Sequence, residues 1–224
     1  MRIENAGENS VIGWFADHAS VEVNESVMAT CNNLEQSMGG AIIDLVPSYA
    51  SLLVIFDPFR THHAEVRERL SAAFERDSSS ETITTVIELP VLYGEAFGPD
   101  LTRISENAGV TEAQVAELHQ SIEYRVYAIG FAPGFAYLGE VDSRLATPRL
   151  ETPRQNVPKG AVAIADRKTA VYPAQSPGGW NLIGLCPTRL IDPAAESPML
   201  ITVGDRVRFV EIDESQYLSL GGEL

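Results

Sequence analysis

Cysteine is scarce in this chain, and long apolar runs are missing. Only Cys31 and Cys186 occur among its 224 residues. Because they lie far apart in sequence, they indicate neither a disulfide framework nor a thiolate zinc site, and we expect two buried free thiols. No apolar run approaches the roughly 18 residues that a membrane helix needs, and the N-terminus lacks the basic and apolar regions of a signal peptide. We therefore expect a cytoplasmic protein.

Positive charge is scarce too. The 16 Lys and Arg residues face 31 Asp and Glu residues, which gives a net charge of -15. Since binding to nucleic acid depends on clustered Lys and Arg, this balance disfavours a nucleic-acid or acidic-membrane protein. The sequence also lacks the P-loop, GxSxG and GxGxxG patterns, so nothing predicts self-contained nucleotide or serine-hydrolase chemistry. His62-His63 has no third ligand at metal spacing, and we predict no metal site.

The first part of the chain alternates strand-like and helix-like segments. Short runs rich in apolar or β-branched residues predict strands at 10–16, 41–46, 51–56 and 82–89. Apolar residues at helical spacing predict helices over 25–38 and 66–74. The resulting order, βαββαβ, is that of a ferredoxin-like α/β sandwich, in which two helices cover one face of a four-stranded sheet. We place this domain at residues 1–89.

The second part, residues 90–224, begins with two predicted helices and continues as β structure. Pro99 and Gly109 suit the two ends of the first helix, and Thr111 with Gln114 forms a capping box for the second. Short strands then alternate with Gly and Pro turns, at 125–131, 160–165, 169–174, 181–186 and 206–212. Such a series favours a closed or partly closed, mostly antiparallel barrel, which leaves few exposed edges. The fold class is therefore α+β.

The stretch from Tyr124 to Pro187 concentrates glycines, prolines, aromatic residues and two arginines. Pro133-Gly134 matches the central positions of a type II turn. Gly178-Gly179 can turn backbone N–H groups together into an anion-binding nest. Arg149 and Arg154 each follow a proline, which holds the backbone extended, and a guanidinium binds carboxylates and phosphates as a fork. These loops predict a site at one mouth of the barrel.

The same residues also have simpler interpretations. The glycine-rich corners can be tight turns whose aromatic neighbours pack in the core, and each arginine can be a solvated or ion-paired side chain. His119 titrates near neutral pH and can serve as a general base. The alternative is a hydrogen-bonded histidine at the edge of the core.

In combination, the motifs resemble the family of the 5-oxoprolinase B subunit, also called the kinase-inhibitor or allophanate-hydrolase-subunit-1 family. The matching segments follow one another along most of the chain: Tyr49-Ala50-Ser51-Leu52-Leu53-Val54, Asp57-Pro58, Gly98-Pro99-Asp100-Leu101, His119, Gly130-Phe131-Ala132-Pro133-Gly134-Phe135, Tyr137-Leu138, Pro148-Arg149, Pro153-Arg154, Tyr172-Pro173, Ser176-Pro177-Gly178-Gly179-Trp180 and Gly204-Asp205. The resemblance implies an N-terminal α/β domain followed by a cyclophilin-like β-barrel.

For function, the resemblance implies one subunit of an ATP-dependent 5-oxoprolinase, which opens 5-oxo-L-proline to L-glutamate together with its A and C subunits as partners. ATP is then a co-substrate of the complex. Three alternatives stay open: an inhibitor that binds a sensor histidine kinase, a subunit of an allophanate- or urea-related amide hydrolase, and a free module that binds a small molecule.

We assign candidate roles to the residues of this region on that hypothesis. His119, Arg149 and Arg154 are the candidate catalytic residues, with the arginines holding phosphate or a developing oxyanion. The candidate substrate-binding residues surround the two Gly-rich corners: Phe131, Pro133, Gly134, Tyr137, Tyr172, Gln175, Ser176, Gly178, Gly179 and Trp180. We expect this site to be completed by a second chain of the complex.

Overall fold

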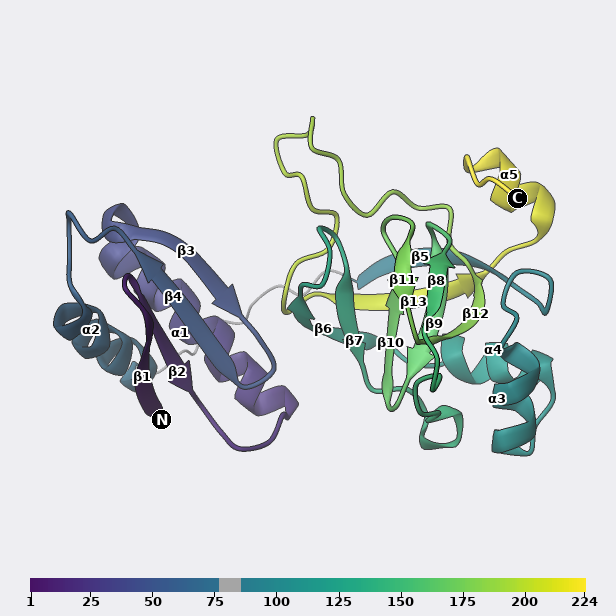
Figure 1. Ribbon diagram of the computed structural model, residues 1–224, viewed down its shortest axis with the longest axis horizontal. Coiled ribbons are helices and arrows are strands. Elements are labelled where there is room, and N and C mark those ends of the chain that lie inside the picture. Colours follow the sequence, from purple (N-terminus) through teal and green to yellow (C-terminus); the bar gives the residue numbers. More distant parts are fainter. Residues whose placement is uncertain (77–85) are drawn as a thin grey trace. The chain divides into compact units, whose positions relative to one another are not determined.

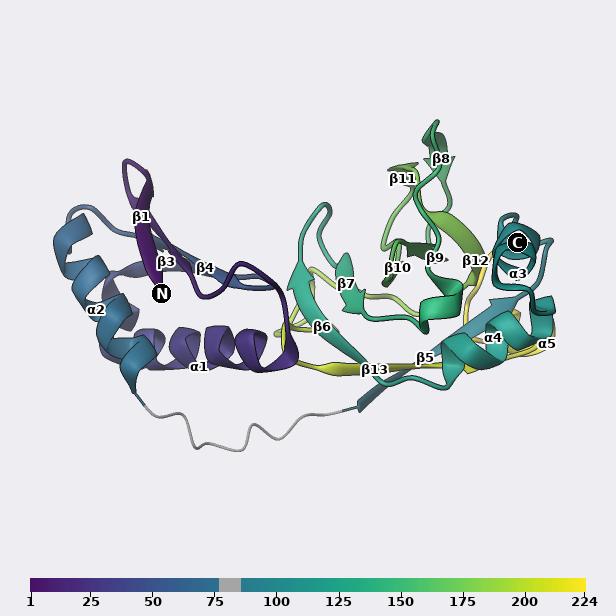
Figure 2. The same ribbon diagram turned by 90° about the horizontal axis from the view of Figure 1, so that it is seen from below.

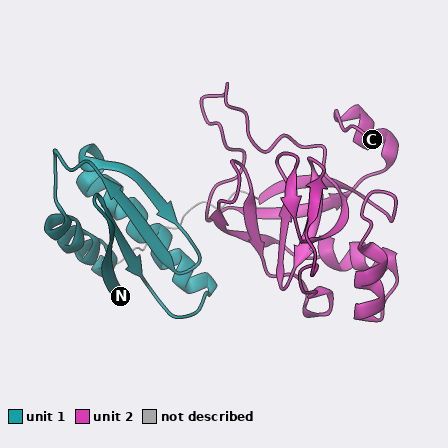
Figure 3. Cartoon of the chain, viewed as in Figure 1, with its two compact units in different colours: residues 1–83 teal, residues 84–224 magenta. Residues whose placement is uncertain are grey.

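The computed structural model describes residues 1–76 and 86–224. It divides into two compact units, Met1–Ile83 and Thr84–Leu224 (Figure 3). The expected boundary after Leu89 falls inside a strand of the second unit, β5 (Val86–Tyr93). In the described part of the chain, no helix combines the length and the apolar character that spanning a bilayer requires.

The first unit is a four-stranded antiparallel sheet with two helices on one face (Figures 1 and 2). Its strands lie in the order β1-β2-β4-β3. Their bounds are β1 (Arg2–Gly7), β2 (Ser10–Trp14), β3 (Ile42–Pro47) and β4 (Ser51–Phe56), and the helices are α1 (Val21–Met38), the short 3-10 helix η1 (Gly39–Ala41) and α2 (His63–Glu75). Alternate residues of β4 point to the helices, so Leu52, Val54 and Phe56 are buried.

The ferredoxin-like prediction is wrong in the order of its elements. Within the described residues the unit reads ββαββα, because β1 and β2 form an N-terminal hairpin. The run at 82–89 is the predicted fourth strand of this sheet. Residues 82–85 lie outside the described residues, and Val86–Tyr93 pairs with barrel strands instead. The sequence did not predict strand β1, because five of its six residues are exposed and the strand shows no alternation of apolar residues.

The second unit is a closed barrel of seven strands, which confirms the predicted barrel. Neighbouring strands follow the order β10-β7-β6-β13-β5-β12-β9, and only β13 and β5 among them pair in parallel. The remaining bounds are β6 (Tyr124–Ile129), β7 (Ala136–Gly139), β9 (Ala161–Ala165), β10 (Lys168–Val171), β12 (Asn181–Leu185) and β13 (Arg206–Glu211). Two short strands, β8 (Arg154–Val157) and β11 (Ser176–Gly178), form a separate ribbon.

Two helices lie side by side at one end of the barrel, α3 (Leu101–Ala108) and α4 (Glu112–Gln120) (Figures 1 and 2). Their buried residues, which include Leu101, Ile104 and Val115, belong to the same core as the inward-facing strand residues. Two of the predicted signals are confirmed, since Gly109 ends α3 with a φ of 66° and Thr111 caps α4 in a capping box with Gln114. Pro99 lies just before α3, which begins at Leu101 after the N-cap Asp100. A short η2 (Ser143–Leu145) and the C-terminal α5 (Glu214–Ser219) complete the unit.

The outer face of β9, β10 and β12 is lined with small side chains. Ala161, Ala163, Ala165 and Ala170 point outward, while their neighbours along the strands point into the barrel. Alanines leave room above the sheet, and large aromatic side chains from the connecting loops fill it. This outer face positions the candidate site.

Candidate functional site

The predicted type II turn at Pro133-Gly134 is confirmed. Gly134 has a φ of 85°, and the N–H of Phe135 donates to the carbonyl of Ala132 at 3.0 Å, which closes the turn. The turn places Phe135 in the core and leaves Phe131 exposed over 62% of its surface. Phe131 also has a φ of 71°, which is unusual for a residue with a side chain and recurs at functional sites.

Five aromatic rings gather on the alanine-lined face: Phe131, Phe135, Tyr137, Tyr172 and Trp180. We call this group the aromatic platform. Phe135 lies at its centre, with its ring centroid 5.0 to 5.7 Å from those of the other four. The rings meet edge to face, an arrangement that aromatic quadrupoles favour. The structure therefore brings together the aromatic residues that the sequence assigned to substrate binding.

Arg149 lies over the platform. Its guanidinium carbon is 5.7 Å from the centre of the Trp180 ring, a distance typical of a cation–π contact. The side chain is exposed and forms no ion pair with any described residue. Stacking thus holds a positive charge at the surface without neutralising it.

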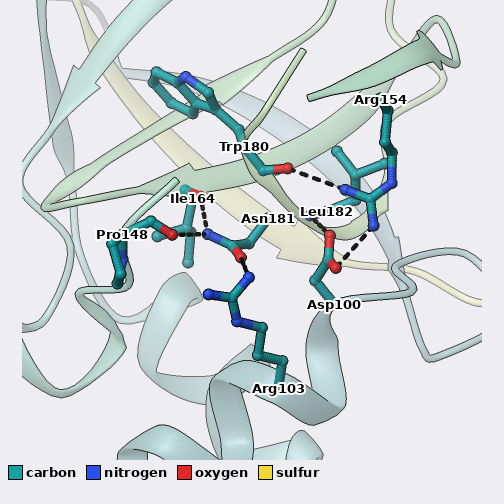
Figure 4. A network of polar contacts seen from close by, with 8 residues as sticks. All are labelled: Asp100, Arg103, Pro148, Arg154, Ile164, Trp180, Asn181 and Leu182. Atoms are coloured by element: carbon teal, nitrogen blue, oxygen red, sulfur yellow. Dashed lines mark hydrogen bonds and ion pairs between the residues drawn. The ribbon is translucent and has the colours of Figure 1, made fainter. Parts of the chain in front are cut away.

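Arg154 is held by an ion pair. Its Nη2 donates to Oδ1 of the buried Asp100 at 2.8 Å, and its Nη1 lies 3.5 Å from the carbonyl oxygen of Trp180 (Figure 4). The Arg154 side chain remains 28% exposed, so it is still partly accessible to solvent. The simpler interpretation of Arg154 as ion-paired is therefore correct. The guanidinium has five N–H donors, and the contacts to Asp100 and Trp180 use two of them.

The positive charges of Arg149 and Arg154 both influence the pKa of the Tyr172 hydroxyl. Burial raises the pKa of Tyr172, and the charges of Arg149 and Arg154 work in the opposite direction. Since the pKa ends above its ordinary value, the hydroxyl keeps its proton at neutral pH. The backbone of Trp180 also lowers the pKa of this hydroxyl, and a protonated tyrosine hydroxyl can donate a hydrogen bond. We call Arg149, Arg154 and the Tyr172 hydroxyl the two-arginine site.

The predicted anion-binding nest at Gly178-Gly179 is wrong. Neither glycine has a φ in the left-handed region, which the alternating form of a nest requires. Gly178 pairs with Arg154 in the β11–β8 ribbon, and the carbonyl of Gly179 accepts a hydrogen bond from Leu150 at 2.7 Å. The glycines serve close packing instead, because a Cβ on Gly178 would lie 2.3 Å from the Tyr172 hydroxyl oxygen.

Of the two further candidates, Gln175 lies at a separate cavity and Ser176 is in the β11–β8 ribbon. Gln175 donates to Asn156 at 3.1 Å and lines a separate cavity of about 380 Å³ together with Lys159. Ser176 follows it in β11, and its hydroxyl is buried without a hydrogen-bond partner among the described residues. The structure therefore does not join Gln175 to the arginines, although the sequence places it only five residues before Trp180.

His119 lies inside the barrel core, with none of its surface exposed. Thr169 donates its hydroxyl proton to the carbonyl of Ala163, so it accepts from His119 Nε2 at 2.9 Å, while Nδ1 accepts from the Tyr93 hydroxyl at 2.7 Å. Burial lowers the pKa of His119 to about 3, so the ring is neutral. Its partners are core residues, and the predicted catalytic role is not supported. The alternative of a hydrogen-bonded core histidine describes it better.

The cysteines and the histidine pair are accounted for by structure. Cys31 and Cys186 are buried free thiols, as predicted. The side chain of His62 caps α2 by accepting a hydrogen bond from the N–H of Glu65 at 3.2 Å. His63 contacts the carbonyl of Gly7 at 3.0 Å. Residues 1–76 and 86–224 contain no cluster of three or more His, Cys, Asp or Glu side chains that could hold a metal ion.

Positive charge is concentrated in the segment of the chain that carries Arg149 and Arg154. Residues 143–191 contain seven Lys and Arg but two Asp and Glu, in a chain whose net charge is -15. Five of the seven form ion pairs with described residues: Arg144, Arg154, Arg167, Lys168 and Arg189. Arg149 and Lys159 have no ion pair within the described part of the chain. Arg149 therefore brings to the platform a positive charge that no ion pair with a described residue neutralises, and such a charge favours an anionic ligand.

Comparison with known proteins places the chain in a family. A family model described as "Carboxyltransferase domain, subdomain C and D" matches residues 1–201. The 5-oxoprolinase B subunit of Bacillus subtilis (strain 168) is 36% identical over 96% of this chain and 95% of its own length. The chain belongs to the family of 5-oxoprolinase B subunits. A second member, from Escherichia coli O157:H7, is 43% identical over 75% of this chain and 78% of its own length.

Other relatives match this chain over part of a longer chain. The solved structure of TTHA0988 is 35% identical, with a TM-score of 0.81 over 95% of this chain, which spans 40% of the length of that chain. A putative urea carboxylase from Emericella nidulans is 23% identical over 67% of this chain and 13% of its own length. The names of these relatives give no support to the inhibitor of a histidine kinase.

Sequence reasoning missed the buried residues that hold the site together. Asp100 and Asn181 carry no special sequence signal, since Asp100 is a common residue type near the start of a predicted helix and Asn181 is the first residue of a predicted strand. Asp100 stands in the Gly98-Pro99-Asp100-Leu101 segment that resembles the family, and that was the available sign. Its partner in space, Arg154, lies 54 positions further along the chain, a pairing that periodicity does not reveal.

Proposed function

We propose that this chain is the B subunit of an ATP-dependent 5-oxoprolinase and acts with the A and C subunits as partners. The names and coverage of the Bacillus and Escherichia relatives support this assignment. TTHA0988, in which the matching segment is part of a longer chain, fits a unit that works beside another domain. The reaction consumes 5-oxo-L-proline, ATP and water, and it yields L-glutamate, ADP and phosphate.

The observation that carries the proposal is the convergence of Arg149, Arg154 and the protonated Tyr172 hydroxyl at one edge of an apolar platform. 5-Oxoproline combines an apolar ring with a carboxylate, and its opening passes through negatively charged oxygens. The lactam is a weak electrophile, and phosphorylation of its carbonyl oxygen by ATP creates a leaving group. Aimed guanidinium and hydroxyl donors stabilise such anions, and the aromatic rings exclude water from one side.

Arg149 gives the sharpest test, because its guanidinium is exposed and forms no ion pair with a described residue. The full chain is reconstituted with its A and C partners, and 5-oxoproline-dependent ADP release is measured. We expect Arg149→Ala to lower kcat/KM by roughly a hundredfold or more, the loss typical of one oxyanion donor. The complex should still assemble, which size-exclusion chromatography reports.

Arg2 provides a matched control. It lies over the ring of Trp14 at 5.6 Å, nearly the same cation–π geometry, but in the first unit. Arg2→Ala should leave turnover within twofold of the wild-type value. No activity from the three wild-type subunits would refute the proposal, and equal losses in both variants would show that the Arg149 effect is not local.

A related amide hydrolysis is the second candidate. The similarity to a putative urea carboxylase favours it, although that match covers only 13% of the longer protein. Supplying allophanate or urea in place of 5-oxoproline in the same ADP-release assay separates the two. Faster turnover of either compound would make this chain part of a urea-related enzyme.

A further inference from the structure

Asp100 precedes α3 at the position where an aspartate usually caps a helix, but its side chain forms no cap bond. Instead its carboxylate turns toward β12 (Figure 4). Oδ2 accepts from the N–H of Leu182 at 2.7 Å, and Oδ1 accepts from Arg154 at 2.8 Å. The Asp100 carboxylate therefore accepts hydrogen bonds from Arg154 and Leu182 and none from the first turn of α3.

The backbone around Asp100 is fixed against β12. The N–H of Asp100 donates to the carbonyl of Leu182 at 3.0 Å, so the two residues are joined in both directions. A Cβ on Gly98 would lie 2.1 Å from the carbonyl carbon of Ile183, which shows how closely the chains approach. The carboxylate is only 8% exposed, and with both oxygens engaged it has one orientation.

That orientation sets the direction of the Arg154 guanidinium. Arg154 uses one N–H on Asp100 and another on the Trp180 carbonyl, which leaves donors without a partner among the described residues. Because a guanidinium is planar, fixing one edge on Asp100 fixes where the other edge points. Arg154 pairs across the β11–β8 ribbon with Gly178, and a Cβ on Gly178 would lie 2.3 Å from the Tyr172 hydroxyl oxygen, so that hydroxyl lies beside the ribbon.

Asn181 fixes the backbone of the loop that carries Arg149. It is fully buried, and its amide donates to the carbonyls of Pro148 and Ile164, each at 3.0 Å, while its oxygen accepts from Arg103 at 3.2 Å (Figure 4). The residue before Arg149 is therefore anchored to β12 and, through Arg103, to α3.

We propose that Asp100 is a positioning residue, which aims Arg154 at an anion bound beside the Tyr172 hydroxyl and thereby couples α3 to the two-arginine site. This inference rests on the proposed function. It assigns Arg154 to ligand binding through its remaining N–H donors and gives Asp100 no contact with substrate. The two arginines are then held in different ways. Stacking on Trp180 orients Arg149, whereas the Asp100 carboxylate orients Arg154.

The first test observes orientation without any catalysis. In the full chain labelled with 15N-arginine, the Nη protons of Arg154 should show restricted rotation, and Asp100→Asn should release it. Arg149, which has no carboxylate partner among the described residues, is the internal control and should rotate in both proteins. Free rotation of Arg154 in the wild-type chain would overturn the proposal.

The second test is a double-mutant cycle on kcat/KM in the reconstituted complex. Asp100→Asn should lower kcat/KM at least tenfold when Arg154 is present and by less than twofold in the Arg154→Ala background. An equal loss in both backgrounds would mean that Asp100 serves folding alone, and it would overturn the proposal. A wild-type complex that is inactive while Arg154 shows restricted rotation would refute the proposed function and leave the orientation by Asp100 standing.

Discussion

Two neighbouring glycines in the site differ in what they contribute. Gly178 lies against the Tyr172 ring, which is buried. Gly179 has its nearest heavy atoms at 3.6 Å, which is ordinary contact. Small size is therefore required at Gly178 but not at Gly179, although the sequence presents them as an equivalent pair.

This difference gives a prediction for single residues. Gly178→Ala should lower the free energy of unfolding by about 1–3 kcal/mol through overpacking and should displace the Tyr172 hydroxyl from the two arginines. Gly179→Ala should change the free energy of unfolding by less than about 0.5 kcal/mol. Urea denaturation of both variants checks this, and comparable losses would contradict the packing described at Gly178.

His119 should make stability depend on pH. Its pKa is about 3 in the folded chain and 6.5 when unperturbed, so only the unfolded chain binds the proton between these values. The stability is complete above pH 6.5 and falls as the pH decreases toward 3. Between pH 7.5 and 5.0 the loss should be about 2 kcal/mol. His119→Gln should remove this part of the slope in urea titrations, whereas His18→Gln, at an exposed position, should retain it.

At the scale of elements, sequence signals for helix ends and turns were reliable where the hydrogen-bonding partners lie within a few residues of one another. The capping box at Thr111, the glycine end of α3 and the type II turn at Gly134 were all predictable, because each is completed within a few residues. The strands Arg2–Gly7 and Arg154–Val157 were missed, since polar, exposed strands lack alternation. Strand Val86–Tyr93 was recognised in part but assigned to the wrong unit, because its partners lie more than 90 positions away.

The capping box itself can be tested. Thr111→Ala removes the acceptor for the N–H of Gln114, which is 3.2 Å away, and should cost about 0.5–2 kcal/mol of unfolding free energy. Thr111→Ser keeps the oxygen and should retain most of the stability. Because α4 carries His119 into the barrel core, the alanine variant should also speed hydrogen exchange along α4. Equal stability of the two variants would show that the cap contributes nothing.

For the whole molecule, the two units have separate cores that share no residue. Each unit also contains one tryptophan, with Trp14 in the first and Trp180 in the second. The sequence indicated two domains through its change from alternating strands and helices to two helices followed by mainly β structure. It could not show how the long-range pairs Asp100–Arg154 and Asn181–Pro148 assemble the site, because such contacts depend on the closed barrel.

Separate cores predict separate unfolding transitions. In Trp14→Phe the emission of Trp180 follows the second unit, and in Trp180→Phe the emission of Trp14 follows the first. We expect different urea midpoints for the two probes, since neither core depends on residues of the other. Lowering the pH from 7.5 to 5.5 should reduce mainly the midpoint reported by Trp180, because His119 lies in that core. Matching far-UV spectra of both variants control for altered folding, and a single shared midpoint at both pH values would show that the units unfold as one.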